Sequence, residues 1–193
     1  MVIGAGAGIG GNVAKRFAKE GFHSVLCRRS NQHGLDDLIR GIEEEGGTAS
    51  GFLINVVEPE SIEKCVEKVE NEIGHINTLV FNLGAQVGNK SLSETTYKIF
   101  ELGWRLATFS LFGTASSVLP KMEKRGKGSF LVTTSTAAFR GNAGQHSHAS
   151  AMGGRRMLCQ SLNAEFASKG IHIVHILVDL SLIHISEPTR LSW

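Results

Sequence analysis

The sequence has few cysteines, little net charge and no long apolar run, and each of these shortages excludes a class of protein. Its three cysteines, Cys27, Cys65 and Cys159, are far apart and odd in number, so they indicate neither a disulfide framework nor a zinc site. Lysine and arginine total 20 against 18 acidic residues, and this net charge of +2 argues against nucleic acid or an anionic membrane as partner. No apolar stretch approaches the roughly 20 residues that span a bilayer. We therefore expect a soluble, cytoplasmic protein with reduced thiols that binds no membrane and no nucleic acid.

Glycine, in contrast, is abundant, and one glycine-rich stretch carries the clearest signal in the chain. Residues 2–11 read VIGAGAGIGG, in which two apolar residues end a short strand and the glycines lead into a helix of about residues 12–20. Glycine lets the chain turn tightly, lets a pyrophosphate approach backbone N–H groups, and lets the helix pack closely on the strand. The pattern predicts a nucleotide-binding turn made by Gly4, Gly6, Gly8, Ile9 and Gly10.

Strand patterns then alternate with helix patterns along the chain. Leu35, Leu38, Ile39 and Ile42, for example, follow the i, i+3, i+4, i+7 spacing of an amphipathic helix. We expect further strands near residues 22–27, 52–56, 76–81, 129–134 and 171–178, and further helices near 35–46, 59–73, 96–124 and 148–168. This alternation predicts an α/β fold, a Rossmann-type doubly wound parallel sheet in three layers, α/β/α.

The two ends of the chain are unusual for such a domain. Few residues precede Gly4, whereas a buried parallel strand usually has about five, so we expect residues to be missing before Met1. Residues 180–190 read LSLIHISEPTR and resemble the in-frame translation of a transposase adapter used in sequencing libraries. We expect one domain at residues 1–179, truncated at its C-terminus, then a non-native tail at residues 180–193. A chain truncated in this way is expected to be inactive.

At this point the chain resembles the short-chain dehydrogenase/reductase family over residues 1–179. The resemblance rests on the glycine turn, the Asn82-Leu83-Gly84-Ala85 run, Ser135 after the fifth strand, and residues 161–166, which read SLNAEF. It implies a Rossmann-type sheet and an NAD or NADP cofactor, bound in part by Asn82 and Gly84. It also implies hydride transfer between the cofactor and a small-molecule carbonyl or alcohol, and a homo-oligomer.

The end of the second predicted strand bears on the choice of cofactor. NAD-binding proteins of this kind place an acidic residue there, while NADP-binding ones supply an arginine for the 2′-phosphate. The sequence has Arg28 and Arg29 and no acid at this point, and a guanidinium suits a phosphate. NADP(H) is therefore favoured over NAD(H). Asn55, with Val56 beside it, stands where the family usually has an Asp near the adenine.

The catalytic positions depart from the family pattern, which is a Ser, then a Tyr, then a Lys four residues further on. Counting from Ser135 places His148 at the Tyr position and Met152 at the Lys position, and the family's structural Asn aligns with Ala107. Histidine can act as an acid–base group near neutral pH. Methionine can neither carry a positive charge nor donate a hydrogen bond. The predicted catalytic residues are Ser135 and His148, in a degenerate site.

Two other interpretations stay open. The chain could be a pseudoenzyme that binds NADP(H) as a sensor or partner subunit, with Ser135 and His148 in ordinary structural roles. It could be an S-adenosylmethionine-dependent methyltransferase, although that fold usually has an acid where Arg28 stands. His146 and His148 could be suggested as metal ligands, but no carboxylate or cysteine lies at ligand spacing beside them, so we expect no metal.

Overall fold

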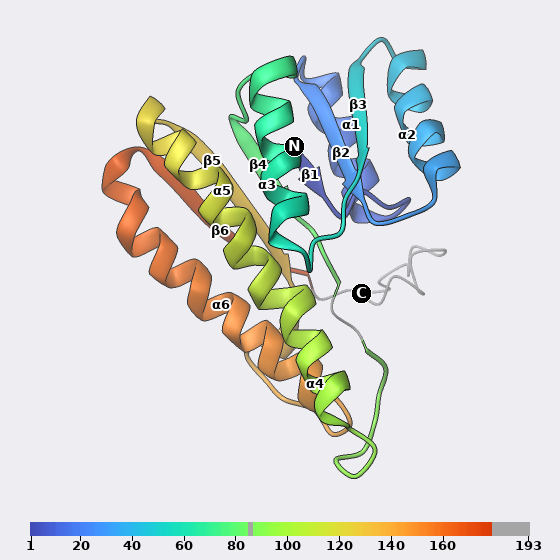
Figure 1. Cartoon of the computed structure of the whole chain (residues 1–193), viewed down its shortest axis with the longest axis vertical. Coiled ribbons are helices and arrows are strands. Elements are labelled where there is room, and N and C mark those ends of the chain that lie inside the picture. The colour runs from blue at the N-terminus through green and yellow to red at the C-terminus, as the bar shows by residue number, and fades with distance from the viewer. Residues whose placement is uncertain (85–86, 179–193) are drawn as a thin grey trace, which may run out of the picture.

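The computed structural model describes residues 1–84 and 87–178, and in them six parallel strands form one sheet (Figure 1). The strands are β1 (Val2–Ile3), β2 (His23–Arg28), β3 (Thr48–Leu53), β4 (Thr78–Phe81), β5 (Gly128–Thr134) and β6 (Ile171–Leu177). Their order is β3-β2-β1-β4-β5-β6. The chain moves outward in one direction from β1 to β3 and in the other from β4 to β6, so the order reverses between β1 and β4. Ligands bind at such a reversal, outside the carboxyl ends of the strands.

Helices cover both faces of the sheet, which confirms the predicted three-layer fold. The two helices on one face are α1 (Ile9–Lys19) and α2 (Gln32–Glu44), and those on the other are α3 (Pro59–Lys68), α5 (Ser110–Arg125) and α6 (His146–Phe166). Each face has its own apolar core: Ala14 and Leu35 pack with Leu26 on the first, and Ile62 and Leu111 pack with Phe81 on the second. Among the described residues, no helix is long and apolar enough to cross a membrane.

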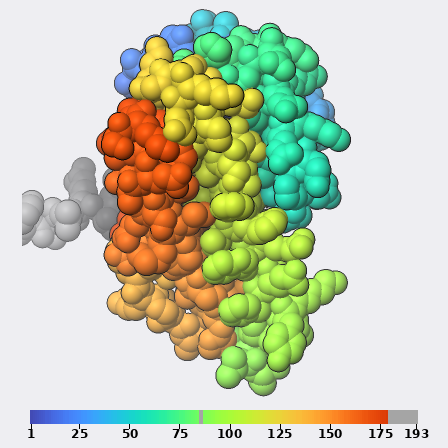
Figure 2. All heavy atoms as spheres, turned by 60° about the vertical axis from the view of Figure 1, so that its left-hand side comes forward, coloured from blue at the N-terminus to red at the C-terminus, as the bar shows by residue number. Residues whose placement is uncertain are grey.

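The predicted long helix at residues 96–124 is three consecutive segments. These are α4 (Tyr97–Trp104), the π-helix η2 (Arg105–Phe109) and α5. The other short segments are the π-helix η1 (Val69–Ile73), which continues α3, and the 3₁₀ turns η3 (Thr136–Ala138) and η4 (Ala167–Lys169). The continuous run of α4, η2 and α5 lies beside α6, and together they make a long two-helix layer. In this layer, α4 and the start of α6 extend past the end of the sheet (Figures 1 and 2).

Two glycines permit the close packing of α4 on α6. A Cβ on Gly103 would overlap the hydroxyl of Ser147, and one on Gly154 would come within 2.7 Å of the Trp104 ring. The Ser147 hydroxyl also donates to the carbonyl oxygens of Ile99, at 3.1 Å, and Phe100, at 3.0 Å. This packing fixes the first turn of α6, where His148 lies.

The third strand begins and ends earlier than the sequence predicted, at Thr48–Leu53 instead of residues 52–56. Its position follows from tertiary packing, because β3 pairs with β2 along its length and α2 packs against Gly51. A Cβ on Gly51 would lie 2.7 Å from a methyl carbon of Ile39, so only glycine admits the helix here. Ile54 and Val56 leave the sheet and fill the core on the α3 side.

A charged cluster joins η1 to α5 on the side of the sheet away from the glycine turn. The carboxylate of Glu70 accepts from the Ile76 N–H at 2.9 Å, His75 at 3.1 Å and both terminal nitrogens of Arg125 at 2.9 and 3.2 Å. Burial works to raise the pKa of Glu70, but the hydrogen bonds from Ile76, His75 and Arg125 outweigh it and the pKa is lowered. The cluster therefore stabilises the ionised carboxylate.

Candidate active site

The glycine turn is held by backbone contacts that leave no room for side chains at two positions. Gly4 has a positive φ of 87°, and its N–H donates to the carbonyl oxygen of Cys27 at 2.9 Å. A Cβ on Gly4 would overlap the carbonyl oxygen of Asn82, and a Cβ on Gly10 would overlap that of Gly4. The turn, β1, β4 and the start of α1 thus approach one another, and the close packing of the helix on the first strand is as the sequence predicted.

The other two glycines of the motif face open space. A Cβ on Gly6 or on Gly8 would meet nothing within 4 Å. Helix α1 begins at Ile9 directly after Gly8, and in the described chain no side chain caps its first turn and no acidic residue lies in that turn. Backbone N–H groups at a helix start attract anions. The turn therefore has both the room and the polarity for a phosphate group.

Asn82 connects the glycine turn to the two central strands. Its amide nitrogen donates to the carbonyl oxygen of Gly4 at 3.2 Å, and its amide oxygen accepts from the Thr133 hydroxyl at 2.8 Å. Its own N–H donates to the carbonyl oxygen of Ile3 at 2.8 Å. One side chain thereby fixes the distance between β1, β4 and β5 where the strands end.

Ser135 and His148 come together although they are 13 positions apart in the chain. Ser135 directly follows β5, and His148 lies in the first turn of α6. The Ser135 Oγ and His148 Nε2 atoms are 3.2 Å apart, so one donates a hydrogen bond to the other according to the tautomer of the ring. Ser135 precedes η3, but its side chain makes no capping bond there.

Two of the positions that the resemblance would make polar, 152 and 107, hold buried apolar residues. Met152 is 2% exposed, and its sulfur accepts a hydrogen bond from the Thr134 hydroxyl at 3.3 Å. Ala107 lies in η2 and is fully buried. Neither side chain can transfer a proton or carry charge.

These features surround a cavity of about 360 Å³ at the carboxyl ends of β1, β4 and β5. Its walls bring together the glycine turn, the end of β4, the end of β5 and one face of α6. The lining residues are Gly4, Gly6, Gly8, Ile9, Gly10, Asn82, Leu83, Gly84, Thr133, Thr134, Ser135, His148, Met152, Arg155 and Val178. Nine predicted site residues are among them, and four are not: Arg28, Arg29, Asn55 and Val56.

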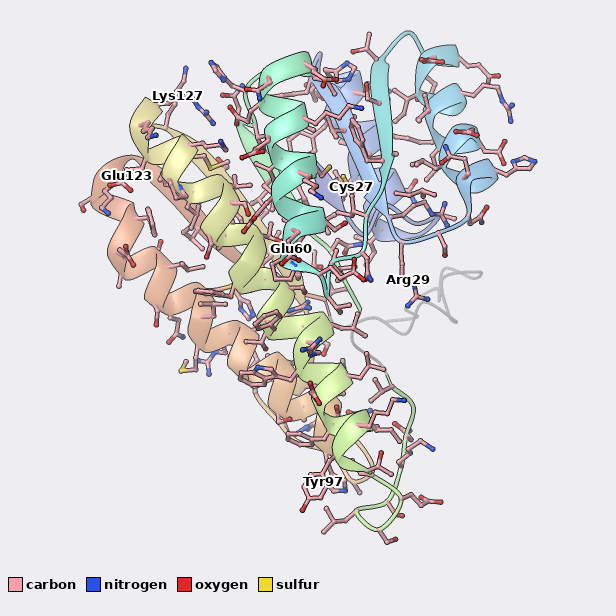
Figure 3. All side chains as sticks on the ribbon, viewed as in Figure 1. Cys27, Arg29, Glu60, Tyr97, Glu123 and Lys127 are labelled. Atoms are coloured by element: carbon pink, nitrogen blue, oxygen red, sulfur yellow. The ribbon has the colours of Figure 1, made fainter. Side chains whose placement is uncertain are left out.

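Those four residues lie at the neighbouring strand ends. Arg28 ends β2, and its guanidinium lies so close to the first turn of α2 that a Cβ on Gly34 would be 3.0 Å from it. Arg29 is exposed and extends from the loop after β2 (Figure 3). The amide nitrogen of Asn55 donates to Glu58 at 2.6 Å, and Val56 is buried in the core.

Arg155 lines the same cavity and was not among the predicted site residues. It is 1% exposed, and its guanidinium donates to backbone carbonyl oxygens of Ala107, Leu83 and Thr133. Its spacing from His148 and Met152 was the available signal, since residues i, i+4 and i+7 share one face of a helix. A charged residue on that face is unusual. Among the described residues as a whole, including the cavity, no group of three His, Cys, Asp or Glu side chains could hold a metal ion.

The fold and the cavity together define a nucleotide-binding α/β protein. A model of the short chain dehydrogenase family matches residues 1–180, and the chain belongs to this family of oxidoreductases. The methyltransferase alternative is thereby left without support.

Individual relatives agree with this assignment. The 3-oxoacyl-[acyl-carrier-protein] reductase FabG of Escherichia coli (strain K12) is 30% identical over 176 residues, covering 90% of this chain and 69% of that protein. Among solved structures, a short-chain dehydrogenase from Rhodopseudomonas palustris has a TM-score of 0.88 at 32% identity, covering 93% of this chain and 83% of the other. A gluconate 5-dehydrogenase from Burkholderia cenocepacia J2315, solved in complex with NADP and tartrate, has a TM-score of 0.84 at 25% identity, covering 91% and 68%.

Proposed function

We propose that this chain binds NADP(H) in the cavity and belongs to an oxidoreductase that interconverts a small-molecule carbonyl and alcohol. The observation that carries the proposal is the cavity itself, which faces an open glycine turn on one side and the Ser135–His148 pair on the other. The empty space beside Gly6 and Gly8 fits a pyrophosphate at the start of α1. The bound cofactor would supply or accept the hydride.

The Ser135–His148 pair would transfer the proton to or from the substrate oxygen. The two atoms share a hydrogen bond at 3.2 Å, and both residues line the cavity. Such a pair can donate a proton to a forming alkoxide or take one from an alcohol, with the serine hydroxyl orienting the ring. Asn82 and Thr133 would keep β4 and β5 at a fixed distance during the reaction, because their side chains are hydrogen-bonded to each other.

The preference for NADP(H) rests on Arg28. Its guanidinium lies beside the first turn of α2, where no acidic residue is present in the described chain. A guanidinium and a helix start both attract a phosphate.

A non-catalytic function is the second candidate, and Met152 and Ala107 favour it. Both are buried and apolar where the family resemblance implies Lys and Asn. On this reading the chain binds NADP(H) and signals or stabilises a partner subunit without turnover.

Isothermal titration with NADPH and NADH tests the cofactor, and loss of NADPH absorbance with a panel of ketones and aldehydes tests catalysis. We expect NADPH to bind about 10- to 100-fold more tightly than NADH, since a charged hydrogen bond contributes roughly that much. Arg28→Gln should remove this difference, while Arg16→Gln, at an exposed arginine paired with Glu20, should keep it. If neither dinucleotide binds, the proposal is wrong. Binding without turnover of any carbonyl by the complete protein would favour the non-catalytic function instead.

We also propose that the protein self-associates. Large apolar side chains are exposed along η2, α5 and α6, among them Phe109, Phe112 and Met157, at 38%, 55% and 49%. These helices form one broad face of the molecule (Figure 2). A second copy of the chain would cover this face.

We further propose a cytoplasmic location. The described cysteines are all free and buried, which fits a reducing compartment.

A further inference from the structure

The cavity contains a buried positive charge that the proposed function has not used. Arg155 lies in the middle of α6, is 1% exposed, and is among the largest fully buried side chains in the described protein. It shares a helix face with His148 and Met152, and all three line the cavity. Position 155 is thus part of the site wall.

The contacts of Arg155 are all with neutral groups. Its Nε donates to the Ala107 carbonyl at 3.1 Å, and its Nη1 donates to the carbonyls of Leu83 and Thr133 at 2.9 Å each. The guanidinium carbon lies 5.0 Å from the centre of the Phe81 ring. The remaining nitrogen, Nη2, is buried and has no hydrogen-bond partner among the described residues.

No described carboxylate compensates this charge. Arg155 takes part in no ion pair within residues 1–84 and 87–178. Cys159, one turn further along α6, is a neutral thiol at pH 7 because burial raises its pKa to about 11. Burial lowers the pKa of Arg155 to about 10, so the guanidinium still carries its charge at pH 7.

A buried, unpaired charge is expensive, and proteins rarely keep one that has no function. The carbonyl oxygens around Arg155 hold the guanidinium in place but leave its net charge unneutralised. That charge therefore acts on whatever occupies the cavity, and it does so strongly because a protein interior screens charges less than water.

We propose that Arg155 is the cation of this site, which attracts electron-rich groups of a bound ligand and disfavours positively charged ones. This inference rests on the proposed function. The two forms of a nicotinamide cofactor differ in the charge of the nicotinamide ring, which is positive when oxidised and neutral when reduced. Arg155 should therefore make the site select the reduced form.

The test is the ratio of the NADP⁺ and NADPH dissociation constants, measured by isothermal titration. Two unit charges within roughly 10 Å in a protein-like dielectric change an affinity about tenfold, so we expect NADPH to bind at least about tenfold more tightly. Arg155→Gln removes the charge and should bring the ratio close to one. Arg155→Lys keeps the charge and should preserve most of the preference. Loss of packing alone would weaken both ligands equally and leave the ratio unchanged.

Arg156→Gln is the matched control, because it removes the same charge one residue away. Arg156 lies over the Phe139 ring, with its guanidinium carbon 4.2 Å from the ring centre, and it does not line the cavity. Its variant should keep the wild-type ratio. An unchanged ratio in Arg155→Gln would overturn the proposal. If that variant does not fold, the wild-type ratio decides, and a value below about three overturns the proposal. If neither cofactor form binds, the proposed function is wrong and this inference falls with it; binding at equal affinity refutes the inference alone.

Discussion

Alanine substitutions at Gly10 and Gly6 should separate the two roles of the glycine turn. A methyl group on Gly10 would overlap the carbonyl oxygen of Gly4 and lie 3.0 Å from the Ala5 Cα. The Gly4 peptide cannot easily move away, because its N–H donates to Cys27 and its carbonyl accepts from Asn82. Gly10→Ala therefore strains the backbone of the fold itself.

The strain in Gly10→Ala is partly offset by a gain in helix propensity. Overpacking a well-packed site costs about 1–3 kcal/mol, and an overlap with backbone lies at the upper end of that range. Replacing a helical glycine by alanine returns about 1 kcal/mol. The net loss of about 2 kcal/mol corresponds to a fall in Tm of roughly 4–8 °C for a protein of this size.

Gly6→Ala is the matched variant, since a Cβ on Gly6 meets no atom within 4 Å. Its stability should stay within about 0.5 kcal/mol of the wild type. Its methyl group would nevertheless occupy the space proposed for the pyrophosphate, so NADPH affinity should fall about tenfold or more. Thermal melts by circular dichroism and NADPH titrations measure the two effects separately. The reasoning is refuted if Gly10→Ala melts like the wild type, or if Gly6→Ala loses as much stability as Gly10→Ala.

Two further changes test the supports of the sheet. Asn82→Ala removes the bonds to the Gly4 carbonyl and the Thr133 hydroxyl, and urea unfolding should show a loss of about 1–3 kcal/mol; an unchanged midpoint would contradict the bridging role. For Glu70, the folded pKa lies below the ordinary value of 4.5, so its stabilisation is complete above about pH 4.5 and disappears as the pH falls through the lower folded pKa. Urea midpoints measured between pH 6 and pH 3 should therefore fall less steeply in Glu70→Gln, and identical slopes would contradict this.

The sequence predicted the fold because its helices and most strands follow local patterns. Leu35 and Ile42 are buried as their spacing requires, and the alternation of strand and helix leaves few topologies. The third strand was misplaced because its residues, TASGFL, have no apolar alternation. Pairing with β2 and the fit of α2 over Gly51 determine its position, and neither is visible in a local window.

The candidate site likewise contains residues that local sequence patterns mark and one residue that only tertiary packing reveals. The glycine turn, Asn82 and the Ser135–His148 pair could be located because short motifs and fixed spacings mark them. Arg155 was missed despite its helical spacing from His148 and Met152, because an arginine in a helix is usually solvated, as Arg16 is. Only the tertiary fold brings three backbone carbonyls from η2, β5 and the end of β4 around one guanidinium.

The residues at positions 107, 152 and 155 are best understood together. The family resemblance implies a lysine at position 152, where the chain has a buried methionine, and the chain has a buried arginine three residues later on the same face of α6. Two cations so close, with no described carboxylate between them, would repel each other strongly in a protein interior. Arg155 also takes the carbonyl oxygen of Ala107 as its hydrogen-bond acceptor, so positions 107 and 155 meet at one guanidinium. Compared with a lysine at position 152, as the resemblance implies, the buried positive charge of Arg155 lies about 4.5 Å further along the helix axis. A cavity wall that carries a buried positive charge supports the proposal of a ligand site there.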